Sequence, residues 1–273
     1  MNRYTASLFA QISLFSSFQT QSYDTPVLEE GKMTTVDLSI TFSKFKNDID
    51  HHYDRRERLI KTSRDVTALS KKMIFSLLRV PVLQADSDED IIPSTIAQEV
   101  QKYESQIAQL LQTAQQDLQE ANTWRYQRNI SPGIQEFVEA ITLKFYIQNQ
   151  RVPALAETQK LVQPVDLTPA DYILGVADLT GELTRRAIAA LAIPGAEALD
   201  YTKKIASCLS DLTIRFQLLD ADRNAEGLRE LSKKIAVMES SLKKVERGVF
   251  ERCVRGSERP EGWVGGADVS RED

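Results

Sequence analysis

The amino-acid sequence predicts an all-α protein. Its 273 residues include only 11 Gly and 9 Pro, and its many Leu, Ala, Gln, Lys and Glu residues favour helix over sheet. From about Thr41 onward, apolar residues recur at intervals of three and four, the period of an amphipathic helix. One of these stretches runs for about forty residues without Gly or Pro, as a long helix does.

Composition narrows the class of protein. Hydrophobic residues at 42% and charged residues at 27% are ordinary for a soluble globular chain. A net charge of −5 argues against a simple basic nucleic-acid-binding module, although it says nothing about local basic patches. Cys208 and Cys253 form neither a metal-ligand spacing nor a disulfide framework, which favours a reducing, intracellular setting. No apolar run approaches the roughly 18 residues of a membrane span, so we expect no membrane partner.

The sequence divides into a helical domain and two ends. Residues 38–256 form the expected helical domain, which an acidic loop interrupts at about 84–94. Residues 1–37 are predicted to be a disordered extension, because much of this stretch is Ser and Gln and it has no acidic residue before Asp24. A weak similarity to a mitochondrial transit peptide is the alternative. Residues 257–273 are also predicted to be disordered. We expect the protein to be cytoplasmic or nuclear.

Apolar spacing predicts helices along the domain. They cover residues 41–80 (one helix or two nearly continuous ones), 94–122, 171–193, 197–219 and 226–252. A further helix lies within 124–150, where Ser131-Pro132 can restart a helix. Most basic residues of the first helix fit a solvated face, and a minority fit a phosphate-contacting stripe. The last helix has a near-heptad apolar stripe, which fits either packing within the chain or a seam between subunits.

The helix at 171–193 carries a pair of acids on a face that is otherwise small and apolar. Thr168-Pro169 introduces it and Pro194-Gly195 stops it. Asp178 and Glu182 lie four residues apart, so both carboxylates project from one face. The same face carries small and apolar residues, including Gly175 and Gly181. We therefore expect another helix to pack closely here, with the two glycines allowing its approach.

A second acid pair lies in the most apolar helix of the chain. Glu136 and Glu139 are three residues apart in a segment that is apolar almost all round, which indicates burial. Buried carboxylates are costly unless they pair with a cation or a metal. Two interpretations stay open from the pattern. Either the four acids converge on a divalent ion, or they form structural salt bridges with arginines, for which the candidates are Arg125, Arg128, Arg185 and Arg186.

Four stretches together resemble the translin family, in particular its Trax (translin-associated factor X) branch. They are DRRERLIKTSRDVTALSKKMIF, RNISPGIQEFVEA, DYILGVADLTGELTRR and the tail phrase VRGSERP. The resemblance runs from about Phe42 to Pro260. It implies an all-helical bundle of about seven helices that assembles into a hollow oligomer. It further implies a translin-type partner subunit in a hetero-oligomer, taken as an octamer, which cleaves single-stranded RNA with Mg²⁺.

The resemblance also implies roles for the four acids. Glu139 and Glu182 match metal ligands, while Glu136 and Asp178 match the other two active-site acids. QEFVEA at 135–140 and DLTGE at 178–182 keep the spacing of the two motifs. Translin itself lacks the full acidic set, so all four acids favour the Trax branch. The N-terminus departs from some family members, because it shows no basic nuclear-localisation run.

The residue types fit this chemistry. Hard oxygen ligands suit Mg²⁺, with Mn²⁺ as the alternative ion. The histidines are His51 and His52 alone, on a charged helix far from the acids in sequence, which weakens a histidine acid–base mechanism.

RNA binding by a net-acidic chain needs local positive charge. Our candidates for phosphate contacts are Arg64, Lys71, Arg128 and Arg185. For Arg185, the alternative is a structural ion pair with the acids. Trp124 and Tyr126 either stack on bases or belong to the core.

Two functional classes follow from the sequence. The first is a metal-dependent endoribonuclease subunit that acts inside a translin-containing assembly. The second is a non-catalytic helical partner that stabilises translin or helps to bind RNA or DNA. The intact set Glu136, Glu139, Asp178 and Glu182 favours the first, because a scaffold has little use for such a cluster.

Overall fold

The computed structural model describes residues 38–82, 91–220 and 230–255, and all regular structure in these ranges is helical. The helices are α2 (Leu38–Leu78), α3 (Ser94–Gln115), α4 (Ala121–Asn149), α5 (Leu155–Val162), α6 (Pro169–Leu191), α7 (Ala196–Asp220) and α8 (Leu231–Arg255). The all-α prediction is confirmed. The predicted extension at 1–37, most of the acidic loop and the tail at 257–273 lie outside the described residues.

The chain divides into two compact units between Asp48 and Ile49, inside α2. Of the first unit, residues 38–48 are described, as a helical stretch with an edge-on contact between the rings of Phe42 and Phe45. The second unit contains the rest of α2 and helices α3 to α8. The functional argument concerns this second unit alone.

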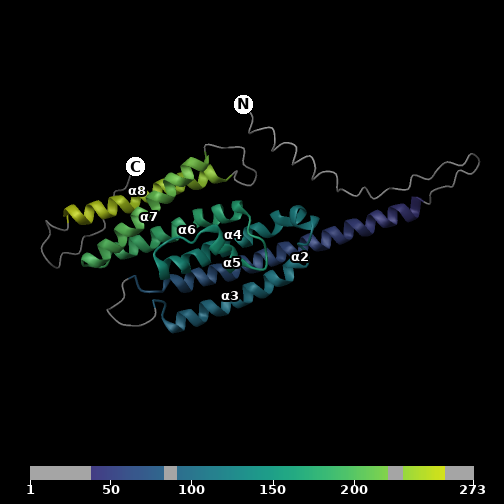
Figure 1. Ribbon diagram of the computed structural model, residues 1–273, viewed down its shortest axis with the longest axis horizontal. Helices are drawn as coiled ribbons and strands as arrows, with labels where there is room; N and C mark the ends of the chain where they lie inside the picture. The colour runs from purple at the N-terminus through teal and green to yellow at the C-terminus, as the bar shows by residue number, and fades with distance from the viewer. Residues whose placement is uncertain (1–37, 83–90, 221–229, 256–273) are drawn as a thin grey trace, which may run out of the picture. The chain divides into compact units, whose positions relative to one another are not determined.

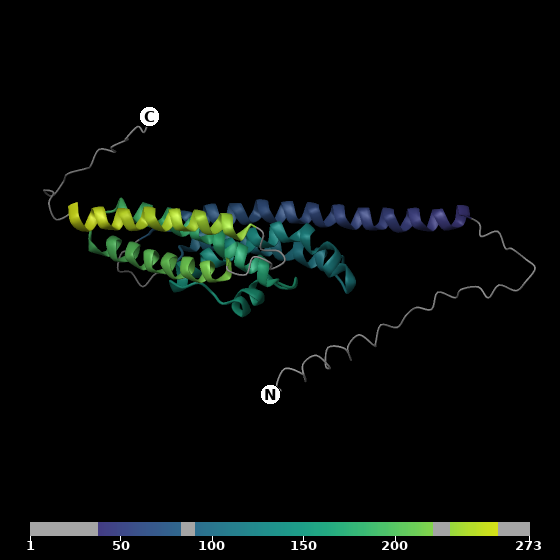
Figure 2. The ribbon, with the colours of Figure 1, turned by 90° about the horizontal axis from the view of Figure 1, so that it is seen from above.

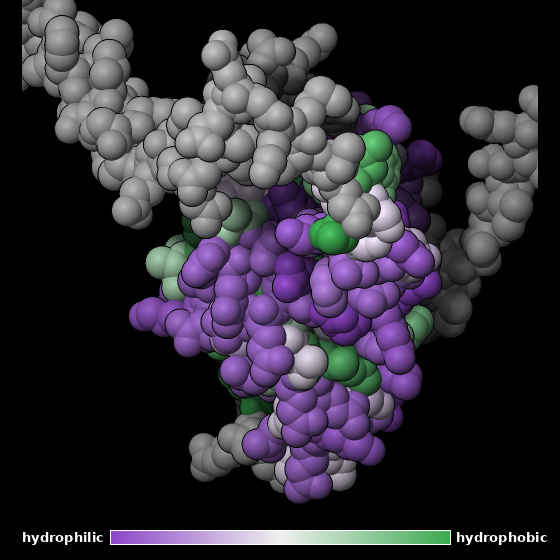
Figure 3. All heavy atoms as spheres, turned by 90° about the vertical axis from the view of Figure 1, so that its right-hand side faces the viewer, coloured by the Kyte–Doolittle hydropathy of each residue, from purple (hydrophilic) through white to green (hydrophobic). Residues whose placement is uncertain are grey.

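Within the second unit, α6 is the central helix. It packs against α4 on one side and against the pair α7–α8 on the other, and the short α5 lies beside α4 (Figures 1 and 2). One large core joins residues from α2 to α8, among which Tyr146, Leu59, Ile134 and Leu179 are fully buried. No helix in the described ranges is long and apolar enough to cross a membrane. The end of the molecule that Figure 3 shows is mostly hydrophilic, with scattered hydrophobic residues.

The predicted helix boundaries are correct for α6 and partly wrong for α4 and α5. Thr168 caps α6 by accepting a hydrogen bond from the Asp171 amide at 3.0 Å, and Pro169 occupies the first turn. Helix α4 begins at Ala121 and continues through Pro132, where we expected a restart. Tertiary packing overrides the local preference there. Helix α5 was missed, because eight residues give too little apolar periodicity to identify a helix.

A buried carboxylate aligns α6 with α4. Asp171 is buried and accepts hydrogen bonds from Gln127 (3.1 Å), Ser131 (3.1 Å) and Gln135 (2.8 Å), which lie on three successive turns of α4. Thr168 adds a fourth at 2.8 Å. Four donors make the burial of this carboxylate tolerable. They fix the register of the two helices directly before the segments that carry the acid pairs.

Two glycines permit close helix contacts, one of them as we expected. A Cβ at Gly175 of α6 would lie 2.7 Å from Val138 Cβ and 2.8 Å from the Gln135 carbonyl oxygen of α4. A Cβ at Gly133 of α4 would lie 2.7 Å from the Ser63 carbonyl oxygen of α2, and Ser63 Oγ accepts from the Gly133 amide. The expectation for Gly181 was wrong within this chain. A Cβ there would meet no described atom within 4 Å, since Gly181 faces outward.

The apolar stripe of α8 packs within the chain. Leu231, Ile235, Met238 and Val245 are buried, and α8 lies against α6 and α7. The first member of the predicted stripe, Leu228, lies outside the described residues. Of the two interpretations that the sequence left open, intramolecular packing therefore accounts for this stripe.

The two glycines of α6 make a matched pair of substitutions. We expect Gly175→Ala to lower the free energy of unfolding by about 1–3 kcal/mol, because the new methyl group must displace Val138 and α4 backbone. Gly181→Ala should leave it unchanged or raise it by up to about 1 kcal/mol, because alanine is the better helix former. Urea denaturation of the two variants checks this. Equal effects would contradict the close approach at Gly175.

Candidate active site: an acidic pocket between α2, α4 and α6

The four predicted acids line one open pocket. Glu136 and Glu139 come from α4, and Asp178 and Glu182 come from α6. The pocket has a volume of about 420 Å³, and its other lining residues are Lys71, Ile74, Phe75, Leu78 and Arg185. The four acids therefore lie together in the described chain, which is the arrangement that the first of the two open interpretations requires.

Helix register brings the acids together. The contacts of Asp171 with Ser131 and of Gly175 with Val138 advance together along both helices, so α4 and α6 run in the same direction. Asp178 and Glu139 follow in the same order and are close enough for their charges to repel. At 3.6 residues per turn, Asp178 and Glu182 lie about one and two turns beyond Gly175, while Glu136 and Glu139 flank Val138, the residue that Gly175 contacts. The closest approach of the helices therefore stands next to the pocket.

Cations contact three of the four carboxylates. Lys71 Nζ lies 3.4 Å from Glu136, and Arg185 Nε lies 3.3 Å from Glu182. Lys234 of α8 donates a hydrogen bond to Asp178. No ion pair to Glu139 is found among the described residues. The salt-bridge interpretation is thus partly correct, but of its four candidate arginines only Arg185 is seen to contact one of these acids.

The other arginines of that interpretation serve elsewhere. The buried Arg186 donates to the carbonyl oxygen of Val80 at 3.2 Å and to Tyr201 Oη at 3.0 Å. It therefore ties α6 to the end of α2 and to α7. Arg125 approaches His52 Nε2 at 2.8 Å.

Burial and mutual repulsion make the pocket unfavourable for negative charge. The pKa of Glu139 is raised from 4.5 to about 8, mainly by burial and then by the charges of Asp178, Glu136 and Glu182. Burial also raises the pKa of Glu182, and Arg185 partly offsets this. Perturbed carboxylates in an open pocket are typical of functional sites. A structural ion-pair cluster would instead neutralise each acid.

The donor set fits a hard divalent cation. Glu182 Oε2 is buried and accepts no hydrogen bond from the described residues, although Arg185 Nε forms an ion pair with it at 3.3 Å. No three His, Cys, Asp or Glu side chains within the described ranges are placed to hold a metal ion by themselves. Mg²⁺ commonly binds through one or two protein carboxylates and keeps waters or substrate oxygens as its other ligands, so Glu139 and Glu182 are the pair that could hold such an ion.

The predicted phosphate-binding cations separate into two groups. Lys71 and Arg185 are exposed and line the acid pocket. Arg64 and Arg128 are exposed on α2 and α4 but do not line it. The aromatic candidates also differ from each other. Tyr126 is only 4% exposed and belongs to the core, whereas Trp124 is 90% exposed and does not.

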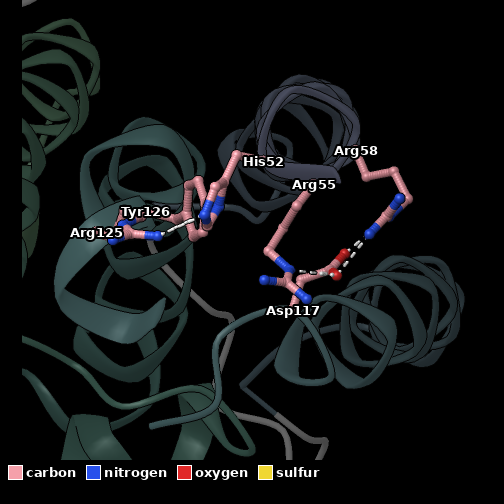
Figure 4. A network of polar contacts seen from close by, with 6 residues as sticks. All are labelled: His52, Arg55, Arg58, Asp117, Arg125 and Tyr126. Atoms are coloured by element: carbon pink, nitrogen blue, oxygen red, sulfur yellow. Dashed lines mark hydrogen bonds and ion pairs between the residues drawn. The ribbon is translucent and has the colours of Figure 1, made fainter. Parts of the chain in front are cut away.

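His52 lies in a separate network (Figure 4). His52 Nδ1 and Tyr126 Oη share a hydrogen bond, and Arg125 approaches the other side of the imidazole. Next to them, Arg55 and Arg58 donate to Asp117, which follows α3; the distances are 3.2 Å from Arg55 and 2.7 Å from Arg58 Nη2. The Arg58 contact lowers the pKa of Asp117. Neither histidine lines the acid pocket, so histidine acid–base chemistry has no support there.

Two residues of the site were not predicted. Lys234 lies 56 residues after Asp178, and no motif connects them. Phe75 has a weak sequence signal, because it falls one turn after Lys71 and outside the apolar stripe that we assigned to the first helix.

The raised pKa of Glu139 predicts a pH-dependent stability. Between pH 4.5 and about 8 the folded chain keeps a proton that the unfolded chain releases, so the free energy of unfolding falls as pH rises through this window. The slope is at most about 1.4 kcal/mol per pH unit. Glu139→Gln should reduce this slope, as measured by urea denaturation in EDTA from pH 5 to pH 9. Glu246→Gln, at an exposed position of α8, is the control. The same slope in both variants would refute the assignment.

Comparison with known sequences points to one family. Residues 54–256 match the model of the Translin family. Translin-associated protein X of Mus musculus is 31% identical over 267 residues, which cover 88% of this chain and 87% of that protein. The Translin-associated protein X homolog of Schizosaccharomyces pombe is 28% identical over 218 residues, with coverage of 80% and 89%.

Solved structures share the fold. The crystal structure of apo-NeC3PO has a TM-score of 0.58 and 20% identity, and the match covers 81% of this chain and 98% of that one. The AfC3PO–duplex RNA complex has a TM-score of 0.56 and 18% identity, with coverage of 80% and 100%. At this identity the likeness concerns the arrangement of helices and not the chemistry.

Proposed function

This chain belongs to the translin family, and from that membership and the acid pocket we propose that it is the catalytic subunit of an endoribonuclease. The reaction is the hydrolysis of phosphodiester bonds in single-stranded RNA. The observation that carries the proposal is the convergence of Glu136, Glu139, Asp178 and Glu182 in one open pocket that two exposed cations also line. The Trax-type relatives support this branch of the family.

Glu139 and Glu182 are the residues that would hold a divalent ion, Mg²⁺ or Mn²⁺. They are the two acids of the pocket whose pKa values burial raises, and the buried Glu182 Oε2 accepts no hydrogen bond, its near cation being Arg185 in an ion pair at 3.3 Å. Loading therefore requires Glu139 to lose its proton at neutral pH. When bound, such an ion acidifies water and offsets the charge of the scissile phosphate.

The other pocket residues position the substrate and the attacking water. Lys71 and Arg185 present exposed cations, and their contacts with Glu136 and Glu182 are long enough to yield to a phosphate. Glu136 and Asp178 accept hydrogen bonds from the water, and one of them takes its proton as general base. Lys234 holds Asp178 in place through its hydrogen bond.

A translin-type subunit is the proposed partner, in a hetero-oligomer that we take to be an octamer. The name of the mouse relative, Translin-associated protein X, states association with translin for that protein. A structural neighbour, AfC3PO, has been solved as a complex with duplex RNA, so that protein binds RNA. We extend both properties to this chain, with single-stranded RNA as the substrate.

Cleavage assays on the reconstituted assembly test the proposal. The chain is combined with a translin-type subunit, and an end-labelled single-stranded RNA is incubated with Mg²⁺ or EDTA. We expect cleavage with Mg²⁺ alone. Glu139→Gln and Glu182→Gln should each lower the rate by about 100-fold or more, because each removes a carboxylate charge from the site.

Glu246→Gln supplies the matched control, since it removes an equal charge from the exposed surface of α8. Assembly mass is measured for every variant, so that a loss of activity is separated from a loss of the partner. If the Glu139 and Glu182 variants cleave RNA at the parental rate, the chain is a non-catalytic partner of translin instead.

A further inference from the structure

The acid pocket has an apolar side that the hydrolysis proposed above does not use. Ile74, Phe75 and Leu78, from the last two turns of α2, line the same pocket as the four carboxylates. Ile74 is buried and serves the core. Phe75 is 65% exposed, so most of its ring is in contact with water.

Location distinguishes Phe75 from other exposed apolar residues. Single exposed hydrophobic side chains are ordinary on protein surfaces and need no explanation. Several large hydrophobic side chains among the described residues are more than half exposed. Of these, Phe75 is the one that lines the acid pocket. Its immediate neighbours Ile74 and Ser76 are buried, so the helix turns Phe75 away from the core.

The charges beside Phe75 suit a nucleotide. Lys71 lies one helical turn before it, about 6 Å along the axis of α2, and is exposed at the same pocket. Arg185 brings a second exposed cation from α6. A phosphate held by these cations would bring its own nucleoside to the ring. Aromatic rings next to cations form the usual platform for unpaired bases.

We infer that Phe75 stacks on the nucleobase next to the phosphate that is cleaved, and thereby selects unpaired RNA. This inference rests on the proposed function and adds the feature of the substrate that the site recognises. A base in a duplex has both faces covered by its neighbours and cannot stack on the ring. The acids and cations alone read only the backbone, which single-stranded and double-stranded RNA share.

A thermodynamic cycle between protein and RNA tests the inference. The assembly with a translin-type subunit is titrated with single-stranded RNA in EDTA, so that binding is measured without cleavage. RNAs that carry one abasic nucleotide, moved stepwise along the strand, are compared with the intact RNA. For the parent, removing the stacked base should weaken binding about tenfold, as loss of one base–aromatic contact does. The Phe75→Ala assembly should bind the abasic RNA and the intact RNA with equal affinity.

Three further variants separate stacking from other roles. Phe75→Tyr keeps the ring and should bind like the parent, whereas Phe75→Leu keeps apolar volume without the ring and should behave like Phe75→Ala. Phe250→Ala is the matched control, because Phe250 is also 65% exposed but lies on α8 outside the pocket. It should leave the effect of the abasic position unchanged.

The outcomes separate this inference from the proposed function. Coupling between Phe75 and one abasic position supports stacking even if the assembly cleaves no RNA. Efficient cleavage without such coupling overturns the stacking and leaves the nuclease standing. A loss of assembly mass for both Phe75→Ala and Phe75→Leu would assign Phe75 to a subunit interface and overturn the inference as well.

Discussion

The geometry of the acid pocket depends on one buried carboxylate that is not part of it. Asp171 accepts hydrogen bonds from side chains on three turns of α4, and a slip of α6 by one turn would leave the charge buried without its donors. This network sets where α6 stands along α4. The contact of Gly175 with Val138 then sets how close the two axes come. Together they hold four carboxyl groups near one another, although their negative charges repel.

The energetic cost of that arrangement is concentrated on one residue. Glu139 is half-buried and lies among three other carboxylates, and its pKa is raised to about 8. Lys71, Arg185 and Lys234 contact the other three acids from three different helices. A fold that needed only stability would replace such a cluster by apolar residues. The cluster therefore supports the proposed functional role of this pocket rather than a role in stability.

Much of this could be predicted from sequence, and the exceptions have physical causes. Asp178 with Glu182, and Glu136 with Glu139, follow helical spacing, so their shared faces were predictable. Pro132 misled us, because the packing of α4 overrides the local preference to break a helix there. The expected close helix contact at Gly181 was wrong, because spacing identifies a face of a helix but not which part of that face another helix covers. Lys234 could not be predicted, because only the docking of α8 brings it to Asp178.

The pocket lies along the sides of its helices and not at their beginnings. Glu136, Glu139, Asp178 and Glu182 stand well inside α4 and α6, where each backbone amide is already bonded within its own helix. The nearby end of α2 is a C-terminus, whose carbonyl oxygens repel anions and partly engage Arg186. None of the residues that line the pocket in the described part of the chain belongs to the first turn of a helix. In the proposed function, flexible side-chain cations therefore bind the phosphate. Dissolved salt screens such exposed cations more readily than it screens a site built from fixed backbone amides.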